Sequence, residues 1–219
     1  MCWNEQVSFL SYIIIVIVVI VILQQNPSPN VRWQSYFLLT VVTIQLLEGF
    51  LWISIKNEND KFNAAVTAIV LLALWAQPLV NSYLGYKIGS TSSMGHTILY
   101  FTTILFAVLF LYNLYIVTFA NIDFITETTE SCHLNWQRSD TGTFPGSVGI
   151  LPAFYIAGLL LPLLLMLPRR EGLIFFTAGL ITLGLASYRY GQDGSFSSMW
   201  CFLAILYAIA IILAHNMNK

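Results

Sequence analysis

Glu48 is the one acidic residue within the long apolar segments of this 219-residue chain, and chemistry is expected there first. Gln45 lies three residues earlier, so on a helix the two side chains share a face. A carboxylate is costly to keep charged inside a membrane, and such acids are functional candidates by default. Two interpretations stay open. Either Glu48 binds a ligand, an ion or a proton, or it is a neutral acid that hydrogen-bonds a neighbouring helix and only holds the bundle together.

Gln77, Pro78 and Asn81 form a second polar group. Proline has no N–H, so Pro78 kinks a helix and frees the carbonyl of Leu74. Gln77 and Asn81 are four residues apart and point the same way. Amides beside such a kink either build a polar site at mid-depth or only satisfy the freed backbone. The sequence does not separate these two roles.

Other polar residues lie near the ends of apolar segments that face one side of the membrane, the outer side in the orientation given below. They are Asn113, Tyr155, Arg189, Ser198 and Cys201. An aromatic belt at the membrane interface accounts for tyrosines, but it does not account for Asn113 or Cys201. The inner halves of the fourth to seventh segments read as almost wholly apolar. This pattern predicts a polar cavity that is open to the outside and has a hydrophobic floor.

The three cysteines are Cys2, Cys132 and Cys201. Cys2 and Cys132 lie outside the apolar segments, and we expect them to form a disulfide if that side is oxidising. Cys201 lies within a segment, where it is either an inert packing residue or the nucleophile of an enzyme. A metal site built from cysteines and His133 would lack the clustered ligands that zinc requires. We therefore expect no metal.

The composition sets the class of the protein. Hydrophobic residues make up 58% of the chain and charged residues only 9%, whereas a soluble domain is about half apolar and about a quarter charged. A soluble fold of this size has too small an interior to bury so many apolar side chains. The net charge of −1 provides no basic surface for nucleic acid. The sequence thus predicts an integral, multi-pass membrane protein.

Seven segments are long enough to cross a bilayer, which takes about 20 apolar residues. They span residues 7–23, 33–55, 64–86, 97–120, 148–167, 172–190 and 195–215. Most connectors between them are short, so neighbouring helices should pack antiparallel. The predicted fold is all-α, a single domain over residues 1–219 in the form of a seven-transmembrane-helix bundle. The long outer loop, 121–147, is either a lid over the cavity or an ordinary solvated loop.

The orientation follows from lysine and arginine in the connectors, which favour the inner side. With the N-terminus outside, the inner side carries Arg32, Lys87, Arg169, Arg170 and Lys219. Arg169 and Arg170 directly follow the fifth segment and are the strongest indication. We predict that the N-terminus is outside and the C-terminus inside. No lysine lies within the segments, which excludes covalently bound retinal because its Schiff base needs an amine there; no other cofactor is indicated.

Several short motifs occur together along the chain. They are Met1-Cys2-Trp3 followed by Val7-Ser8, Glu48, Gln77-Pro78 with Asn81, Cys132 with Trp136, and Ser198-Met199-Trp200-Cys201. Together they resemble an uncharacterised family of small seven-helix membrane proteins from large algal DNA viruses and protists, over nearly the whole chain. The resemblance implies that these residues form one set and that the protein has a viral or protist origin. It carries no activity.

The first functional hypothesis is a membrane protein that binds a small molecule or an ion in an outward-facing polar cavity, for transport or sensing. Glu48 would bind a proton or cation, Gln77 and Asn81 would lie deeper, and Arg189 would be a charge partner at the mouth. One alternative is a membrane-embedded enzyme with Glu48 as general acid or base and Cys201 as nucleophile. Another is a structural or interaction protein of a virion or host membrane. The lipid bilayer is the expected partner; the membrane itself and the oligomeric state stay open.

Overall fold

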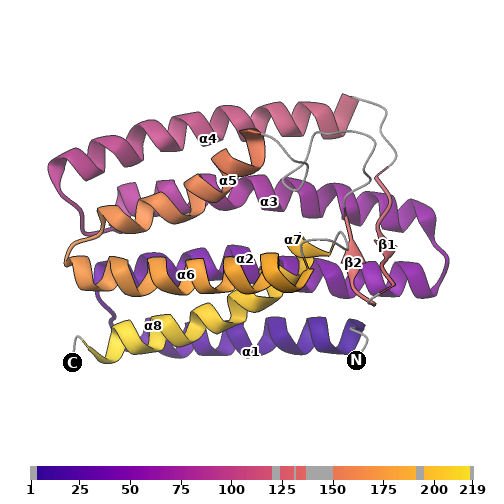
Figure 1. Ribbon diagram of the computed structural model, residues 1–219, viewed down its shortest axis with the longest axis horizontal. Coiled ribbons are helices and arrows are strands. Elements are labelled where there is room, and N and C mark those ends of the chain that lie inside the picture. Colours follow the sequence, from indigo (N-terminus) through magenta and orange to yellow (C-terminus); the bar gives the residue numbers. More distant parts are fainter. Residues whose placement is uncertain (1–3, 120–123, 131, 137–149, 191–194, 218–219) are drawn as a thin grey trace.

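The computed structural model describes residues 4–119, 124–130, 132–136, 150–190 and 195–217. Most of these described residues are helical, and they also include one two-stranded hairpin (Figure 1). In chain order the elements are α1 (Glu5–Gln24), α2 (Pro29–Lys56), α3 (Asp60–Ile88), α4 (Ser93–Phe119), β1 (Glu127–Thr128), β2 (Leu134–Asn135), α5 (Ile150–Leu160), the 3-10 turn η1 (Leu161–Leu165), α6 (Arg169–Tyr190), α7 (Phe196–Leu203), the 3-10 turn η2 (Ala204–Leu206) and α8 (Tyr207–Asn216).

The helices coincide with the predicted apolar segments to within a few residues, and the all-α architecture is confirmed. Of the described helices, six are long and apolar enough to cross a membrane, counting α7, η2 and α8 as one. The fifth segment is shorter, with an apolar helical stretch over Ala153–Leu165. It breaks into η1 because Pro162 cannot donate the hydrogen bond that would continue α5. How the bundle sits in a membrane remains a prediction.

Polar residues in the connectors fix where three of the helices begin. The side-chain oxygens of Asn4, Ser28 and Asn59 accept hydrogen bonds from backbone N–H groups three residues ahead, at 3.0, 3.3 and 3.1 Å. Each bond satisfies one of the N–H groups that a helix start leaves without a partner. Pro29 follows Ser28 at the first position of α2, where its missing N–H costs nothing.

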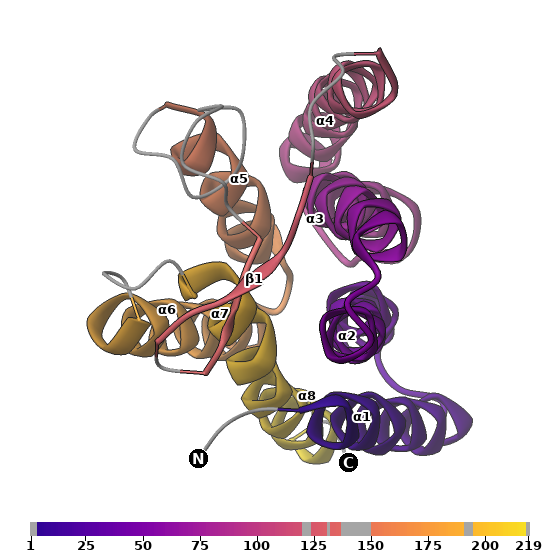
Figure 2. The same ribbon diagram turned by 90° about the vertical axis from the view of Figure 1, so that its right-hand side faces the viewer.

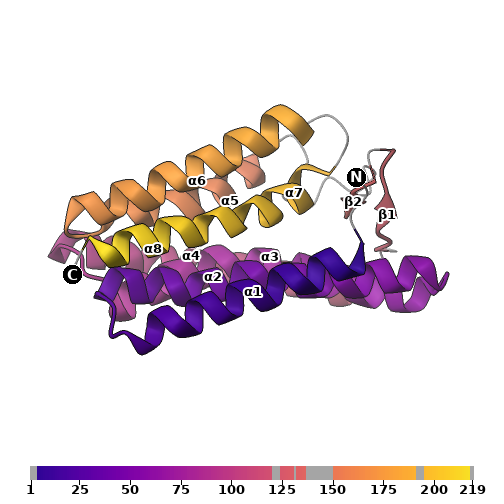
Figure 3. The same cartoon turned by 90° about the horizontal axis from the view of Figure 1, so that it is seen from below.

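The helices form two layers. α1 to α4 lie side by side in chain order, and α5, α6 and the α7–α8 segment form a second layer beside them (Figures 2 and 3). The α7–α8 segment returns to pack against α2 and α1, so residues from both ends of the chain meet in the core. The chain starts at the end of the bundle that carries the hairpin and finishes at the opposite end (Figure 1).

The hairpin belongs to the long connector and covers one end of the bundle. Strand β1 pairs antiparallel with β2. Asn63 of α3 anchors its start: Asn63 Nδ2 donates to the Thr126 carbonyl at 3.0 Å, and Asn63 Oδ1 accepts from Thr126 N at 2.8 Å. Thr67 adds a hydroxyl contact to Thr126 Oγ1 at 2.7 Å. Leu134 of β2 and Trp136, which follows the strand, are buried. The described part of the loop is therefore packed against the bundle and not simply solvated.

Candidate functional site

Glu48 lies in the interior between the two layers, with only 4% of its surface exposed. Gln45, one turn earlier on α2, donates from Nε2 to Glu48 Oε2 at 2.9 Å. Ser198 of α7 donates from Oγ to Glu48 Oε1. Glu48 therefore shares a helix face with Gln45 as expected, and it has a partner from the seventh segment. The carboxyl group joins the first layer to the second.

A small void of about 10 Å³ lies beside this carboxyl group. His133 and Leu134 of the hairpin close it on one side, and Ser8 of α1 and Ser198 of α7 contribute hydroxyl groups. The sequence predicted a cavity open to the outside. In the described part of the chain the carboxyl group is instead enclosed, because the hairpin packs over it.

Gln45 brings an unsatisfied acceptor to the same place. Its side chain is 0% exposed, and its Oε1 has no hydrogen-bond partner among the described residues. A buried acceptor without a partner carries the full cost of its lost hydration. Such a cost is offset where a cation, a proton on the neighbouring carboxyl group or a water molecule reaches the oxygen.

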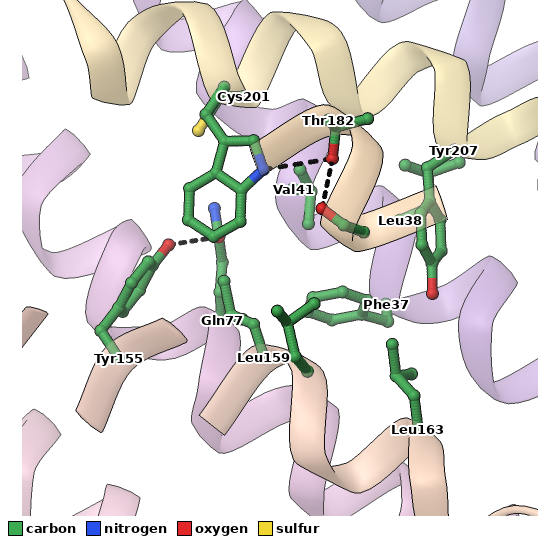
Figure 4. Close-up of a pocket in the computed structure, with 13 residues that line it drawn as sticks. Phe37, Leu38, Val41, Gln77, Tyr155, Leu159, Leu163, Thr182, Cys201 and Tyr207 are labelled. Atoms are coloured by element: carbon green, nitrogen blue, oxygen red, sulfur yellow. Dashed lines mark hydrogen bonds between the residues drawn. The ribbon is translucent and has the colours of Figure 1, made fainter. Parts of the chain in front are cut away.

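A second, larger cavity of about 50 Å³ lies deeper in the bundle (Figure 4). Cys201, one turn after Ser198, lines it together with Gln77, Tyr155, Thr182 and residues of α2, α5 and α8. Tyr155 donates to Gln77 Oε1 at 2.7 Å, which leaves Gln77 Nε2 buried with no partner among the described residues. This volume holds a few water molecules at most.

Asn81 does not line either cavity, and its hydrogen bonds are made within the protein. Its Oδ1 accepts from Trp33 Nε1 at 3.0 Å, and its Nδ2 donates to the carbonyl oxygen of Leu159 at 2.9 Å. Nδ2 also lies 3.5 Å from the carbonyl oxygen of Gly158, whose usual partner would be the missing N–H of Pro162. Asn81 thus satisfies the broken end of α5. From the sequence, the amides were offered as partners for the Leu74 carbonyl freed by Pro78; the described contacts of Asn81 are instead to Trp33 and α5, and Gln77 lines a cavity.

Besides Asn81, two further predicted site residues lie apart from both cavities. Asn113 is buried but donates to the carbonyl of Leu109 in its own helix at 2.8 Å. Arg189 is exposed on α6, and no ion pair with it occurs among the described residues. The expected charge partner at the mouth is therefore not observed. Of the other predicted residues, Glu48 and Ser198 line the small void with Gln45 bonded to Glu48, and Gln77, Tyr155 and Cys201 line the central cavity.

Buried polar groups also occur toward the end of the bundle opposite the hairpin, the end at which the sequence predicted a hydrophobic floor. Tyr207 of α8 donates to Gln34 Oε1 of α2 at 2.9 Å. At the far end Glu171, 2% exposed, accepts from Asn30 Nδ2 at 2.7 Å and Ser28 Oγ at 3.1 Å. These residues were missed because they come from α2, from α8 and from the edge of α6. Ser28 and Asn30, which flank Pro29 at the start of α2, were the available signal.

The remaining candidates from the sequence are the cysteines and His133. Cys132 is disulfide-bonded and Cys201 is a free, buried thiol. Cys2 lies outside the described residues, so the predicted Cys2–Cys132 pairing stays a prediction. No histidine lines the cavity that contains Cys201 among the described residues. His133 lines the void beside Glu48, a position that the sequence did not predict.

Comparisons with protein-family models, with curated proteins and with solved structures found no match to this chain. The function is accordingly argued from the site alone.

Proposed function

We propose that this chain is a multi-pass membrane protein that binds a proton or a small cation at Glu48, for transport or for sensing, with its N-terminus outside. The observation that carries the proposal is the enclosed carboxyl group of Glu48, held by Gln45 and Ser198 beside a small void. Gln45, which donates to Glu48, also carries a buried acceptor, Oε1, with no partner among the described residues.

The size of the voids favours an ion over an organic molecule. Sites for small organic ligands are about 300–1,000 Å³. The void at Glu48 is about 10 Å³ and the central cavity about 50 Å³. The first is of the size of one water molecule or one small ion.

The chemistry around the void suits a positive species. Carboxylate and hydroxyl oxygens come from Glu48, Ser198 and Ser8, which line the void, and Gln45 is hydrogen-bonded to Glu48 through its Nε2. Oxygen ligands of this kind are preferred by hard cations. A proton fits equally, because a protonated carboxyl group donates to Gln45 Oε1 or to Ser198 Oγ after those groups rotate.

Uptake and release at this site require movement of the elements that enclose it. The donors to Glu48 come from α2 and α7, and the hairpin that covers the void is anchored on α3. An ion that binds the closed arrangement more strongly than an open one shifts the population between them. This coupling is the physical basis for transport or for sensing.

Ion flux into sealed vesicles tests the proposal. The purified chain would be reconstituted in vesicles containing a pH-sensitive dye, and radioactive sodium uptake would be followed in parallel. We expect an inward ion gradient to drive a signal that Glu48→Gln abolishes. Glu171→Gln is the matched control, because it removes the charge of another buried acid far from the void. If flux is unchanged in Glu48→Gln, Glu48 is a packing residue. The interaction-protein hypothesis would then replace ion binding.

A further inference from the structure

An apolar groove runs along the outside of the bundle between α4 and the α5–η1 segment. Its volume is about 410 Å³, which lies within the range of ligand sites. The floor is buried and includes Leu99 and Phe106 of α4 and Gly158 of α5, while Ile98 and Leu161 form exposed rims. Phe106 fits directly over Gly158, where a Cβ atom would lie 2.1 Å from the Phe106 ring. The absence of a side chain at Gly158 therefore allows Phe106 to pack closely on α5 at the floor of the groove.

One end of this groove carries a fixed positive charge. Leu164 lines the groove and lies in the 3-10 turn η1, where a carbonyl pairs with the N–H three residues later; that N–H, of Leu167, donates to the Ser90 carbonyl. Arg169 instead donates to the Leu164 carbonyl from Nη1. Its guanidinium is thereby held at the groove end while the residue stays exposed. A guanidinium has five N–H donors and binds phosphate well, so most of them stay available for an anion.

We propose that this groove binds an anionic phospholipid, with an acyl chain along α4 and α5 and the phosphate headgroup at Arg169. The apolar lining suits a hydrocarbon chain and offers nothing to a polar ligand. The charge lies at the end of the membrane segment, which is the level at which headgroups occur. This proposal is independent of ion binding at Glu48, since the two sites share no residue.

Native mass spectrometry of the full chain in detergent tests it. The probes are palmitoyl-oleoyl phosphatidylglycerol and palmitoyl-oleoyl phosphatidylcholine, which share acyl chains and differ in headgroup charge. We expect phosphatidylglycerol to be retained about fivefold more than phosphatidylcholine, as one basic residue at a headgroup implies. Arg169→Gln should bring the ratio close to one. Ala157→Trp, which fills the groove, should remove bound lipid of both kinds.

Two control variants match the size and charge of these changes. Lys87→Gln removes a cation near the same end of the bundle, where Lys87 lies over Tyr86 and not at the groove. Ile17→Trp adds a ring on the exposed face of α1. Both should retain lipid as the parent does, with all variants checked for unchanged elution volume and thermal unfolding. The proposal is overturned if the parent shows no headgroup preference, if Arg169→Gln keeps it, if Lys87→Gln loses it equally, or if Ala157→Trp retains the parental lipid.

Discussion

Ser198 of α7 donates its hydroxyl hydrogen to Oε1 of Glu48 on α2, a bond between residues 150 positions apart in the chain. It joins the layer of α1 to α4 to the layer of α5 to α8 at the level of the hairpin. Gln45, which lies on the same helix as Glu48, donates to the other carboxyl oxygen. The bond from Ser198 is therefore the one that breaks when the two layers move apart. The predictions below follow from this and from related contacts.

Replacement of Glu48 should separate its charge from its hydrogen bonds. Glu48→Gln keeps the shape and most of the hydrogen bonding, so the free energy of unfolding should change by less than about 1 kcal/mol. Glu48→Leu leaves Ser198 Oγ and Gln45 Nε2 without an acceptor, which should cost about 1–3 kcal/mol. Denaturant unfolding in detergent measures both. Equal stability of the two variants would mean that the hydrogen bonds of Glu48 contribute nothing to the fold.

Tyr155 and Gln77 should show coupled effects on stability. Tyr155→Phe removes the donor to Gln77 Oε1 and leaves a buried amide with neither end paired, at a cost of about 1–3 kcal/mol. In Gln77→Leu the hydroxyl of Tyr155 loses its acceptor in the same way. The double variant Tyr155→Phe/Gln77→Leu should cost less than the sum of the two, by about 1 kcal/mol. A double-mutant cycle from unfolding data checks this, and additivity would show that the bond contributes no coupling energy.

Sequence reasoning predicted the helices well because the physics that specifies them is local. Runs such as residues 7–23 are apolar over the length of a bilayer crossing, and capping residues such as Ser28 lie where the helices begin. It also placed Gln45 beside Glu48, since their spacing alone determines a shared face.

The remaining parts of the site depend on contacts between distant segments. Whether Asn81 faces a cavity or the backbone of α5 depends on how Pro162 breaks α5 and on which helix packs against α3. The burial of Glu171 depends on Asn30 and Ser28 arriving from another helix start. No spacing within one segment contains this information.

Labelling of introduced cysteines should establish the orientation. In a background without Cys201, a cysteine at the exposed Glu127 of the hairpin should react with a membrane-impermeant maleimide added outside intact cells. A cysteine at the exposed His96, near the start of α4, should react only after the membrane is permeabilised. The physical reason is the bias of Arg169, Arg170 and Lys87 toward the inner side. The reverse pattern would place the hairpin and the Glu48 void on the inner side of the membrane.

The hairpin should control access to Glu48. Asn63 accepts from and donates to the backbone of Thr126, and these two bonds hold the start of the hairpin on α3. Asn63→Ala removes both bonds. The arrangement in which the hairpin has left α3 should then become about fivefold more populated for each kcal/mol of hairpin binding free energy that is lost. Glu48 would then react faster with a hydrophilic carbodiimide, measured as adduct formation on the peptide that contains it. Ser198→Ala should give a smaller increase, because the hairpin stays in place.

Asn113→Ala is the control for this measurement, since it removes a buried asparagine whose hydrogen bond lies within α4. It should leave the labelling rate of Glu48 unchanged. If Asn63→Ala also leaves that rate unchanged while the variant remains folded, the hairpin does not gate the void. Glu48 would then be reached from within the bundle, through the central cavity beside Cys201. Cys201→Phe fills part of that cavity and leaves the hairpin in place. It should therefore not raise the labelling rate of Glu48 by either route, and it should lower that rate if the reagent enters through the cavity.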